Sequence, residues 1–168
     1  MPSLDSKITE PLIRELYGLW HAKCHGDLPP LKSDLPIQEL PHAIWPHLVF
    51  YDVTDEGRYF GIYNGTQIVE HFGAETTGHY MDDFISVGFT ASVLPLYDGA
   101  MERGRAVLYA GDLNADDDRF YVYSRLLLPL RSDGDGKGHI MGIMIVTGEE
   151  YTYNRPMSNE RRHIIWDD

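Results

Sequence analysis

A helical block separates two groups of strand-like runs, and this order restricts the possible folds more than any other feature. The runs His47–Val53 and Arg58–Tyr63 flank Asp55-Glu56-Gly57, which is typical of a hairpin. Three more runs follow the block, at Arg105–Asp112, Arg119–Leu130 and His139–Thr147. Strands on either side of a helical block favour an α+β domain with an antiparallel sheet, here of five strands.

The block begins at Tyr63 and runs past Tyr80 into a longer helix. Thr66 can cap a short helix, Thr66–Phe72, whose apolar residues recur at spacings of three and four. Gly73 and Gly78 allow tight turns, and Asp82–Ile85 can form another. The run Ser86–Gly104 predicts a longer helix with a kink at Pro95. We expect the segment to form one wall of a pocket.

The N-terminal region predicts an amphipathic helix at Pro11–Cys24. Its apolar stripe must cover either the sheet or a second subunit, so we expect a homodimer through this helix. A proline-rich stretch, residues 27–46, follows as an ordered connector. We therefore divide the chain into the helix and connector (1–46), a core (47–148) and a polar C-terminal tail (149–168).

Composition excludes several classes of protein. The 168 residues fit one domain, and the net charge of -12 argues against nucleic-acid and anionic-membrane partners. Cys24 is the only cysteine, so the chain has no internal disulfide and no four-cysteine zinc site. The sequence shows neither a signal peptide nor a run of about 20 apolar residues, so we expect a cytoplasmic protein.

The same order of elements carries short motifs that resemble a PAS domain, and more narrowly the stand-alone PAS-like family of alphaproteobacteria. Each motif alone is weak, but together they span about residues 12–147. The matching segments are Leu16-Tyr17-Gly18-Leu19-Trp20, Leu28-Pro29-Pro30-Leu31-Lys32-Ser33-Asp34, Ile44-Trp45-Pro46-His47-Leu48, Gly65-Thr66, Gly73-Ala74-Glu75-Thr76-Thr77-Gly78 and Leu126 to Leu130.

The resemblance implies a fold and a class of function. It implies that the helical block packs on one face of a five-stranded sheet, and that the N-terminal helix packs on the other face or pairs two subunits. The cavity between sheet and block would hold haem, flavin, a small organic acid or nothing. It implies a sensor that binds a small molecule and signals to a partner protein; no cofactor is identified by the sequence.

Candidate ligand-binding residues are those expected near this cavity. Arg125 is the most informative, because an inward guanidinium needs an anion, either from a ligand or from an Asp. An outward Arg125 under the N-terminal helix is the alternative. The full set is Tyr63, His71, Phe72, Tyr80, Phe84, Phe89, Ser124, Arg125 and Met141.

Other residues with reactive side chains have simpler interpretations. His21, Cys24 and His25 share adjoining helix faces, but a fourth metal ligand is missing and Cys24 is expected to pack as a small apolar residue. No cysteine lies between Asn64 and Phe84, which excludes a flavin–cysteine photosensor. We therefore predict no metal site and no catalytic residues.

Two alternatives to the sensor remain open. One is a ligand-free adaptor that uses the N-terminal helix or the apolar Ile164–Trp166 tail to dock a partner. The other is a small cone-shaped isomerase or dehydratase, with Asp82 or Asp83 as base and Tyr63 or Tyr80 as proton donor.

Overall fold

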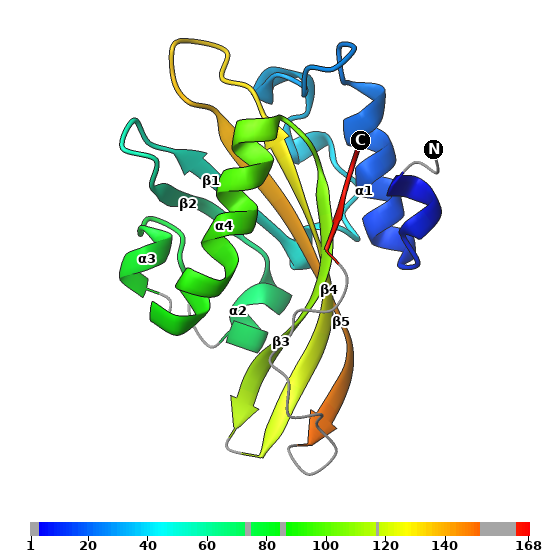
Figure 1. The fold of residues 1–168 in the computed structure, drawn as a ribbon, viewed down its shortest axis with the longest axis vertical. Coiled ribbons are helices and arrows are strands. Elements are labelled where there is room, and N and C mark those ends of the chain that lie inside the picture. Colours follow the sequence, from blue (N-terminus) through cyan, green and yellow to red (C-terminus); the bar gives the residue numbers. More distant parts are fainter. Residues whose placement is uncertain (1–3, 73–74, 85–86, 117, 152–163) are drawn as a thin grey trace.

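One antiparallel sheet forms the centre of the molecule (Figure 1). The computed structural model describes residues 4–72, 75–84, 87–116, 118–151 and 164–168. The strand order is β2-β1-β5-β4-β3-β6. The strands are β1 (Leu48–Val53), β2 (Tyr59–Asn64), β3 (Val107–Asp116), β4 (Arg119–Leu130), β5 (His139–Tyr151) and β6 (Ile165–Trp166).

Helices cover both faces of this sheet. On one side lie α1 and the connector, and on the other lies the block between β2 and β3, with α4 running across the sheet (Figure 1). The α-helices are α1 (Pro11–Ala22), α2 (Thr66–Phe72), α3 (Met81–Phe84) and α4 (Val87–Arg103). Short 3-10 helices occur at Leu4–Lys7, Lys32–Asp34, Ile37–Glu39 and Trp45–His47.

The apolar stripe of α1 is buried on the sheet of its own chain. Ile13, Leu16 and Trp20 are at most 2% exposed and pack on β4 and β5. Pro129 lies beyond the part of β4 that pairs with β3, and its carbonyl accepts a hydrogen bond from the Trp20 indole N–H at 2.9 Å. The predicted helix is confirmed, but its stripe is not free to pair two subunits, which removes the reason for expecting a homodimer there.

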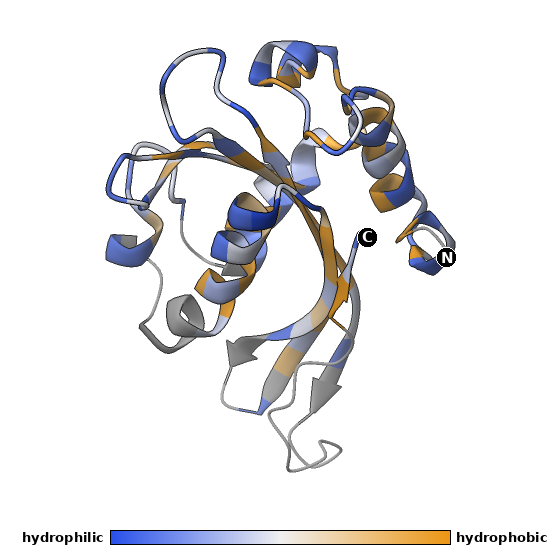
Figure 2. Ribbon diagram, turned by 45° about the horizontal axis from the view of Figure 1, so that its top comes forward, coloured by the Kyte–Doolittle hydropathy of each residue, from blue (hydrophilic) through white to orange (hydrophobic). Residues whose placement is uncertain are grey.

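The opposite face packs against α4 and is rich in tyrosine. Tyr51, Tyr97, Tyr109 and Tyr123 are each at most 2% exposed. Hydrophobic residues lie along the strands of the sheet and also on α1 and α4 (Figure 2). The sheet therefore has two separate cores, and an inner strand must be apolar on both faces.

The block is attached to β2 by a close backbone approach. Residues 76–80 run beside β2, with Gly61 N–H donating to His79 O (2.9 Å) and Gly78 N–H donating to Gly61 O (2.8 Å). A Cβ on Gly61 would lie 2.1 Å from Thr76 O, and one on Gly65 would lie 2.3 Å from the carbonyl oxygens of Trp45 and Pro46. Both positions therefore need glycine because backbone fills the place of a side chain.

The prediction of a five-stranded sheet is wrong, because the sheet has six strands. β6 comes from the region that we expected to be a polar tail, and it pairs with β3 at Val107 and Leu108. Trp166 packs against α4, where a Cβ on Gly99 would lie 2.7 Å from its ring, and the Arg103 guanidinium carbon lies 4.2 Å from its ring centroid. These contacts occupy Ile165 and Trp166, two of the three tail residues that an adaptor would have used for docking, whereas Ile164 is 42% exposed.

Most other elements agree with the sequence to within a few residues. The hairpin at Asp55–Gly57 closes with Gly57 at φ 80°, α2 has the predicted bounds, and β4 has the predicted bounds. Two strands are longer at their C-terminal ends than predicted: β3 continues past Asp112 to Asp116, and β5 continues past Thr147 to Tyr151. No helix among the described residues is both long enough and apolar enough to span a membrane.

Candidate functional site

Arg125 points toward α4 from the middle of β4. Side chains alternate between the faces of a strand. Tyr123 and Leu127, two residues to either side of Arg125, belong to the core under α4, whereas Leu126 and Leu128 belong to the core under α1. Arg125 is only 3% exposed. The inward alternative of the two that the sequence left open is therefore the one observed.

The guanidinium of Arg125 is only partly satisfied by hydrogen bonds. Its Nη2 donates to the Tyr97 hydroxyl of α4 at 2.6 Å. Its Nε is buried and has no hydrogen-bond partner among the described residues. A buried donor without a partner costs free energy, and a buried charge costs more.

The positive charge of Arg125 persists at neutral pH. Burial alone would lower its pKa, but the neighbouring tyrosine oxygens raise the pKa above its ordinary value. Burial also raises the pKa of Tyr97 well above its ordinary value, although Arg125 acts in the opposite direction, so Tyr97 stays a neutral phenol. The described part of the interior contains no buried Asp or Glu, so Arg125 meets hydroxyl groups there and no counter-charge.

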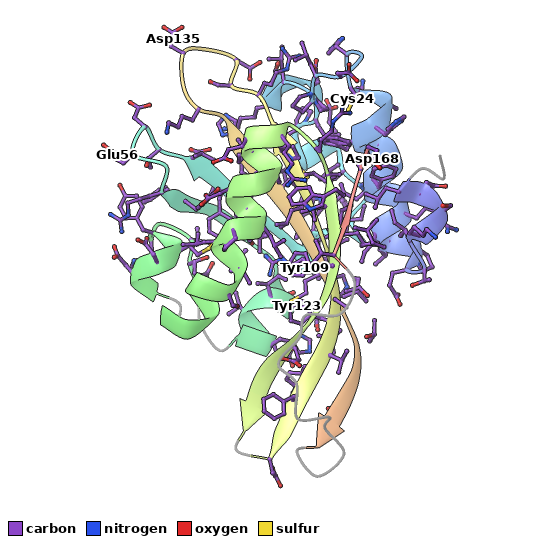
Figure 3. The ribbon with its side chains drawn as sticks, in the orientation of Figure 1. Cys24, Glu56, Tyr109, Tyr123, Asp135 and Asp168 are labelled. Atoms are coloured by element: carbon purple, nitrogen blue, oxygen red, sulfur yellow. The ribbon has the colours of Figure 1, made fainter. Side chains whose placement is uncertain are left out.

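Four tyrosines surround this charge; we call Tyr51, Tyr97, Tyr109 and Tyr123 the tyrosine cluster. Tyr109 of β3 and Tyr123 of β4 lie near one another at the middle of the sheet, with ring centroids 6.4 Å apart (Figure 3). The Tyr51 hydroxyl is hydrogen-bonded to Thr76 Oγ1 at 2.8 Å, which connects the cluster to the helical block. The cluster offers apolar ring surface beside a single buried cation.

Gly142 leaves room for the guanidinium on the sheet. It pairs with Val49 of β1 and Leu127 of β4. A Cβ at Gly142 would lie 2.9 Å from a Val49 methyl, 3.1 Å from a Leu127 methyl and 3.6 Å from Arg125 Nη2. The backbone of Gly142 therefore lies beneath the charged group.

One turn of α4 connects Arg125 to both edge strands of the sheet, β2 and β6. Tyr97 contacts Arg125, Asp98 accepts a hydrogen bond from the Tyr59 hydroxyl of β2 at 2.7 Å, and Gly99 faces Trp166 of β6. A displacement of Tyr97 would therefore act on contacts with two edge strands.

Three of the predicted ligand-binding residues lie away from this group, on the side of the sheet that α1 covers. Ser124 alternates with Arg125 and shares its face with Leu126. Met141 is fully buried in the core under α1. Tyr63 packs against that core, and its hydroxyl donates to Trp45 O at 2.9 Å.

The remaining predicted residues lie on or near the helical block. His71 bonds to Gln67 O through Nδ1 at 2.7 Å, and its ring meets that of Tyr121 at 4.8 Å. Tyr80 packs under the Arg58 guanidinium at 3.9 Å from its ring centroid. The side chains of Phe72, Phe84 and Phe89 lie outside the described residues. Arg125 is thus the one predicted residue that the described side chains place in the buried group.

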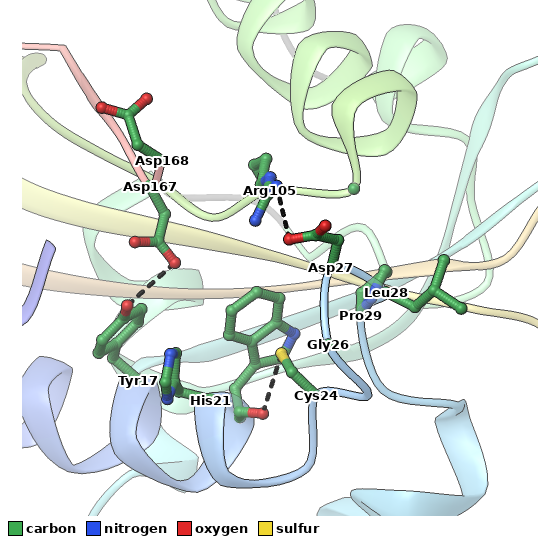
Figure 4. A pocket seen from close by; sticks show the side chains of 12 residues that line it. Tyr17, His21, Cys24, Gly26, Asp27, Leu28, Pro29, Arg105, Asp167 and Asp168 are labelled. Carbon is green, nitrogen blue, oxygen red and sulfur yellow. Dashed lines mark hydrogen bonds and ion pairs between the residues drawn. The ribbon is translucent and has the colours of Figure 1, made fainter. Parts of the chain in front are cut away.

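A separate pocket of about 180 Å³ opens between the end of α1, the connector and the C-terminal residues (Figure 4). Asp27 pairs with Arg105 at 3.2 Å, and the Tyr17 hydroxyl donates to Asp167 at 2.9 Å. Cys24 also lines this pocket, where burial raises its pKa to about 11. A thiol with that pKa is not a ready nucleophile at neutral pH.

The pairings considered for metal binding or catalysis are not assembled in the described part of the chain. No group of three or more His, Cys, Asp or Glu side chains gathers there in a way that could hold a metal ion. Asp82 and Asp83 lie at the surface, each 3.0 Å from an Arg58 nitrogen. The Asp base that the cone-fold alternative requires is therefore not in the described interior.

The predicted set contains none of the four members of the tyrosine cluster, and the strand pattern holds a signal for Tyr51 and Tyr109. Each is the central member of an alternating run, Val49-Tyr51-Val53 in β1 and Val107-Tyr109-Gly111 in β3. Once Arg125 is known to face α4, placing these runs in phase with it identifies both tyrosines.

Comparison with known proteins gives no relatives: no family model, no curated protein and no solved structure matches this chain.

Proposed function

We propose that this chain is a PAS-like sensor that binds a small ligand between the sheet and α4 and passes the signal to a partner protein. Binding would occur at Arg125 and the tyrosine cluster. The output would be a change at the surface of α4 and β6.

The arrangement of layers supports this proposal. The helical block is inserted between β2 and β3 and packs on one face of an antiparallel sheet, and α1 packs on the other face. This is the arrangement that the resemblance to PAS domains implies. Homodimerisation through α1 is not part of the proposal, because its apolar stripe covers the sheet.

The observation that carries the proposal is the buried charge of Arg125. A guanidinium at 3% exposure, with an unpartnered Nε and no carboxylate among the buried residues described, costs free energy to keep in an interior. An apolar residue of similar size would pack there without that cost. A ligand that supplies the missing interactions gives the charge a role that packing does not.

The contacts of α4 support the output half of the proposal. Tyr97 bonds to the charged group, and Gly99 and Arg103 both touch Trp166 of β6. A ligand that displaces Tyr97 therefore acts directly on the helix that holds β6 in place. Coupling between two sites needs such an element with two arrangements.

The test is thermal unfolding of the purified protein in the presence of fractionated metabolite pools. We expect at least one fraction to raise the melting temperature, because a ligand that binds only the folded state stabilises it. Intact mass measured under non-denaturing conditions should then show a bound small molecule. The Arg125→Met variant should lose the response.

A protein whose melting temperature no fraction changes, and whose intact mass equals that of the chain, would refute the sensor. It would favour the alternative of a ligand-free adaptor.

A further inference from the structure

We propose, resting on the proposed function, that the ligand is a small organic acid with one carboxylate and an apolar or aromatic body. Its carboxylate binds the Nε–Nη2 edge of Arg125, and it takes this position from the Tyr97 hydroxyl.

The Nε–Nη2 edge of the guanidinium has the geometry of a carboxylate site. Nε–H and Nη2–H point in the same direction from one edge of the planar group, and two parallel hydrogen bonds from such an edge fit the two oxygens of a carboxylate. In the described structure Nη2 is bonded to Tyr97, and the buried Nε has no hydrogen-bond partner. Half of the edge is therefore without a partner in the described part of the chain.

The charge of the site selects a monoanion. Arg125 is the only cationic side chain among the buried residues of the described part of the chain. The protein as a whole carries -12, so a multiply charged anion would enter against the overall field with one cation to receive it. One carboxylate balances one guanidinium, whereas a phosphate dianion leaves a negative charge in the interior.

The surroundings of the site select the body of the ligand. Tyr51, Tyr109 and Tyr123 present ring surface near the guanidinium, and Met144 and Leu127 belong to the same core. Aromatic rings pack well on such side chains, and a polar body would lose its hydration there. An acid with an aromatic or aliphatic body therefore fits better than a dicarboxylate or a sugar acid.

Tyr97 competes with the ligand for the same donor. Its hydroxyl occupies Nη2 at 2.6 Å, so a bidentate carboxylate binds only after this bond breaks. Removing the hydroxyl leaves Nη2 without a partner in the free protein and makes ligand binding more favourable. If the Tyr97 hydroxyl only stabilised the folded structure, its removal would weaken ligand binding instead.

The experiment measures binding of benzoate, phenylacetate and hexanoate to the full chain by calorimetry, with thermal unfolding in parallel. The matched neutral probes are benzamide, phenylacetamide and hexanamide, and inorganic phosphate tests the alternative anion. We expect at least one carboxylate to bind and its amide to bind at least about tenfold more weakly, because hydrogen bonds to a charged group are the strong ones. This comparison uses only the wild-type protein.

Variants then locate the site. Arg125→Met should lose at least about tenfold in carboxylate affinity. Arg125→Lys keeps the charge but not the planar edge, so its carboxylate affinity should lie between that of Arg125→Met and that of wild type. Tyr97→Phe should bind the carboxylate about tenfold more tightly. Arg105→Met, which removes an arginine from the separate pocket, should bind as wild type does.

Each result decides the inference. Equal binding of acid and amide, binding of phosphate alone, undiminished binding by Arg125→Met, or weaker binding by Tyr97→Phe would overturn it. If no carboxylate binds but a metabolite fraction still raises the melting temperature, the carboxylate inference fails and the sensor function stands. If no probe and no fraction has an effect, both fail.

Discussion

Replacing Gly61 by alanine should detach the helical block from β2. The added Cβ would lie 2.1 Å from Thr76 O and 2.7 Å from its carbonyl carbon, and neither atom can rotate away because both belong to the backbone. Residues 76–80 must therefore move. The move disrupts two backbone hydrogen bonds of Gly61, with His79 and Gly78.

The size of the effect follows from the bonds that hold this segment. Besides the two backbone bonds, Thr76 Oγ1 is bonded to the Tyr51 hydroxyl and to Asn64 Nδ2, both at 2.8 Å and buried. At about 1 kcal/mol net for each bond, loss of two to four of them lowers the free energy of unfolding by about 2–4 kcal/mol. Alanine returns about 0.5–1 kcal/mol by restricting the unfolded chain, which leaves a net loss of about 1–3.5 kcal/mol.

Urea unfolding followed by circular dichroism measures this loss, and the chain supplies a matched control. Gly18 lies in α1, is exposed, and has nothing within 4 Å of an added Cβ. Gly18→Ala should raise the free energy of unfolding by about 0.5–1 kcal/mol, because glycine is a poor helix former. The reasoning is refuted if Gly61→Ala stays within about 0.5 kcal/mol of wild type, the range of ordinary surface substitutions.

Three further predictions concern β6, the cysteine and a histidine. Gly99→Ala should push Trp166 off α4, since its Cβ would lie 2.7 Å from the indole, and amide exchange at residues 165–167 should become faster; unchanged exchange would contradict the contact. Cys24, with its pKa raised to about 11, should react with Ellman's reagent at pH 8 roughly a hundredfold more slowly in the folded than in the urea-unfolded chain, because the thiolate fraction falls about tenfold per pKa unit; equal rates would contradict this. Burial, and secondarily the charge of His71, lowers the pKa of His47 in the folded chain. As the pH falls, the unfolded chain therefore takes up the His47 proton at a higher pH than the folded chain does. The free energy of unfolding should then decrease as the pH drops below about 6.5 toward the folded pKa. His47→Asn should therefore lose less stability than wild type between pH 7 and pH 5, and an equal loss would contradict the assignment.

The elements with a long periodic pattern could be predicted from the sequence. α1 repeats its apolar residues over three turns, and β4 keeps strand-forming residues over its full length. β6 could not be predicted, because two residues are too short to show a period of two. Its position depends on contacts of Trp166 and Asp167 with α4, α1 and Ala106, which are distant in the sequence.

The candidate site was predictable only as far as Arg125. β4 is buried on both faces, so Leu126, Leu127 and Leu128 are all fully buried and give no sign of which alternate residues face α4. Arg125 and Ser124 therefore could not be assigned to a face from the sequence. Met141 and Met144 show the same ambiguity: being three residues apart on one strand, they lie on opposite faces, and Met144 is the one beneath α4.

The contact of Trp166 with Gly99 and Arg103 gives the protein an intrinsic optical reporter. The indole is half-buried against α4, whereas Trp20 is buried between α1 and the sheet and Trp45 lies in the connector. In a chain that carries Trp20→Phe and Trp45→Phe, emission would come from Trp166 alone. Its wavelength would follow the hydration of the α4–β6 contact in real time, without a dye or an attached label.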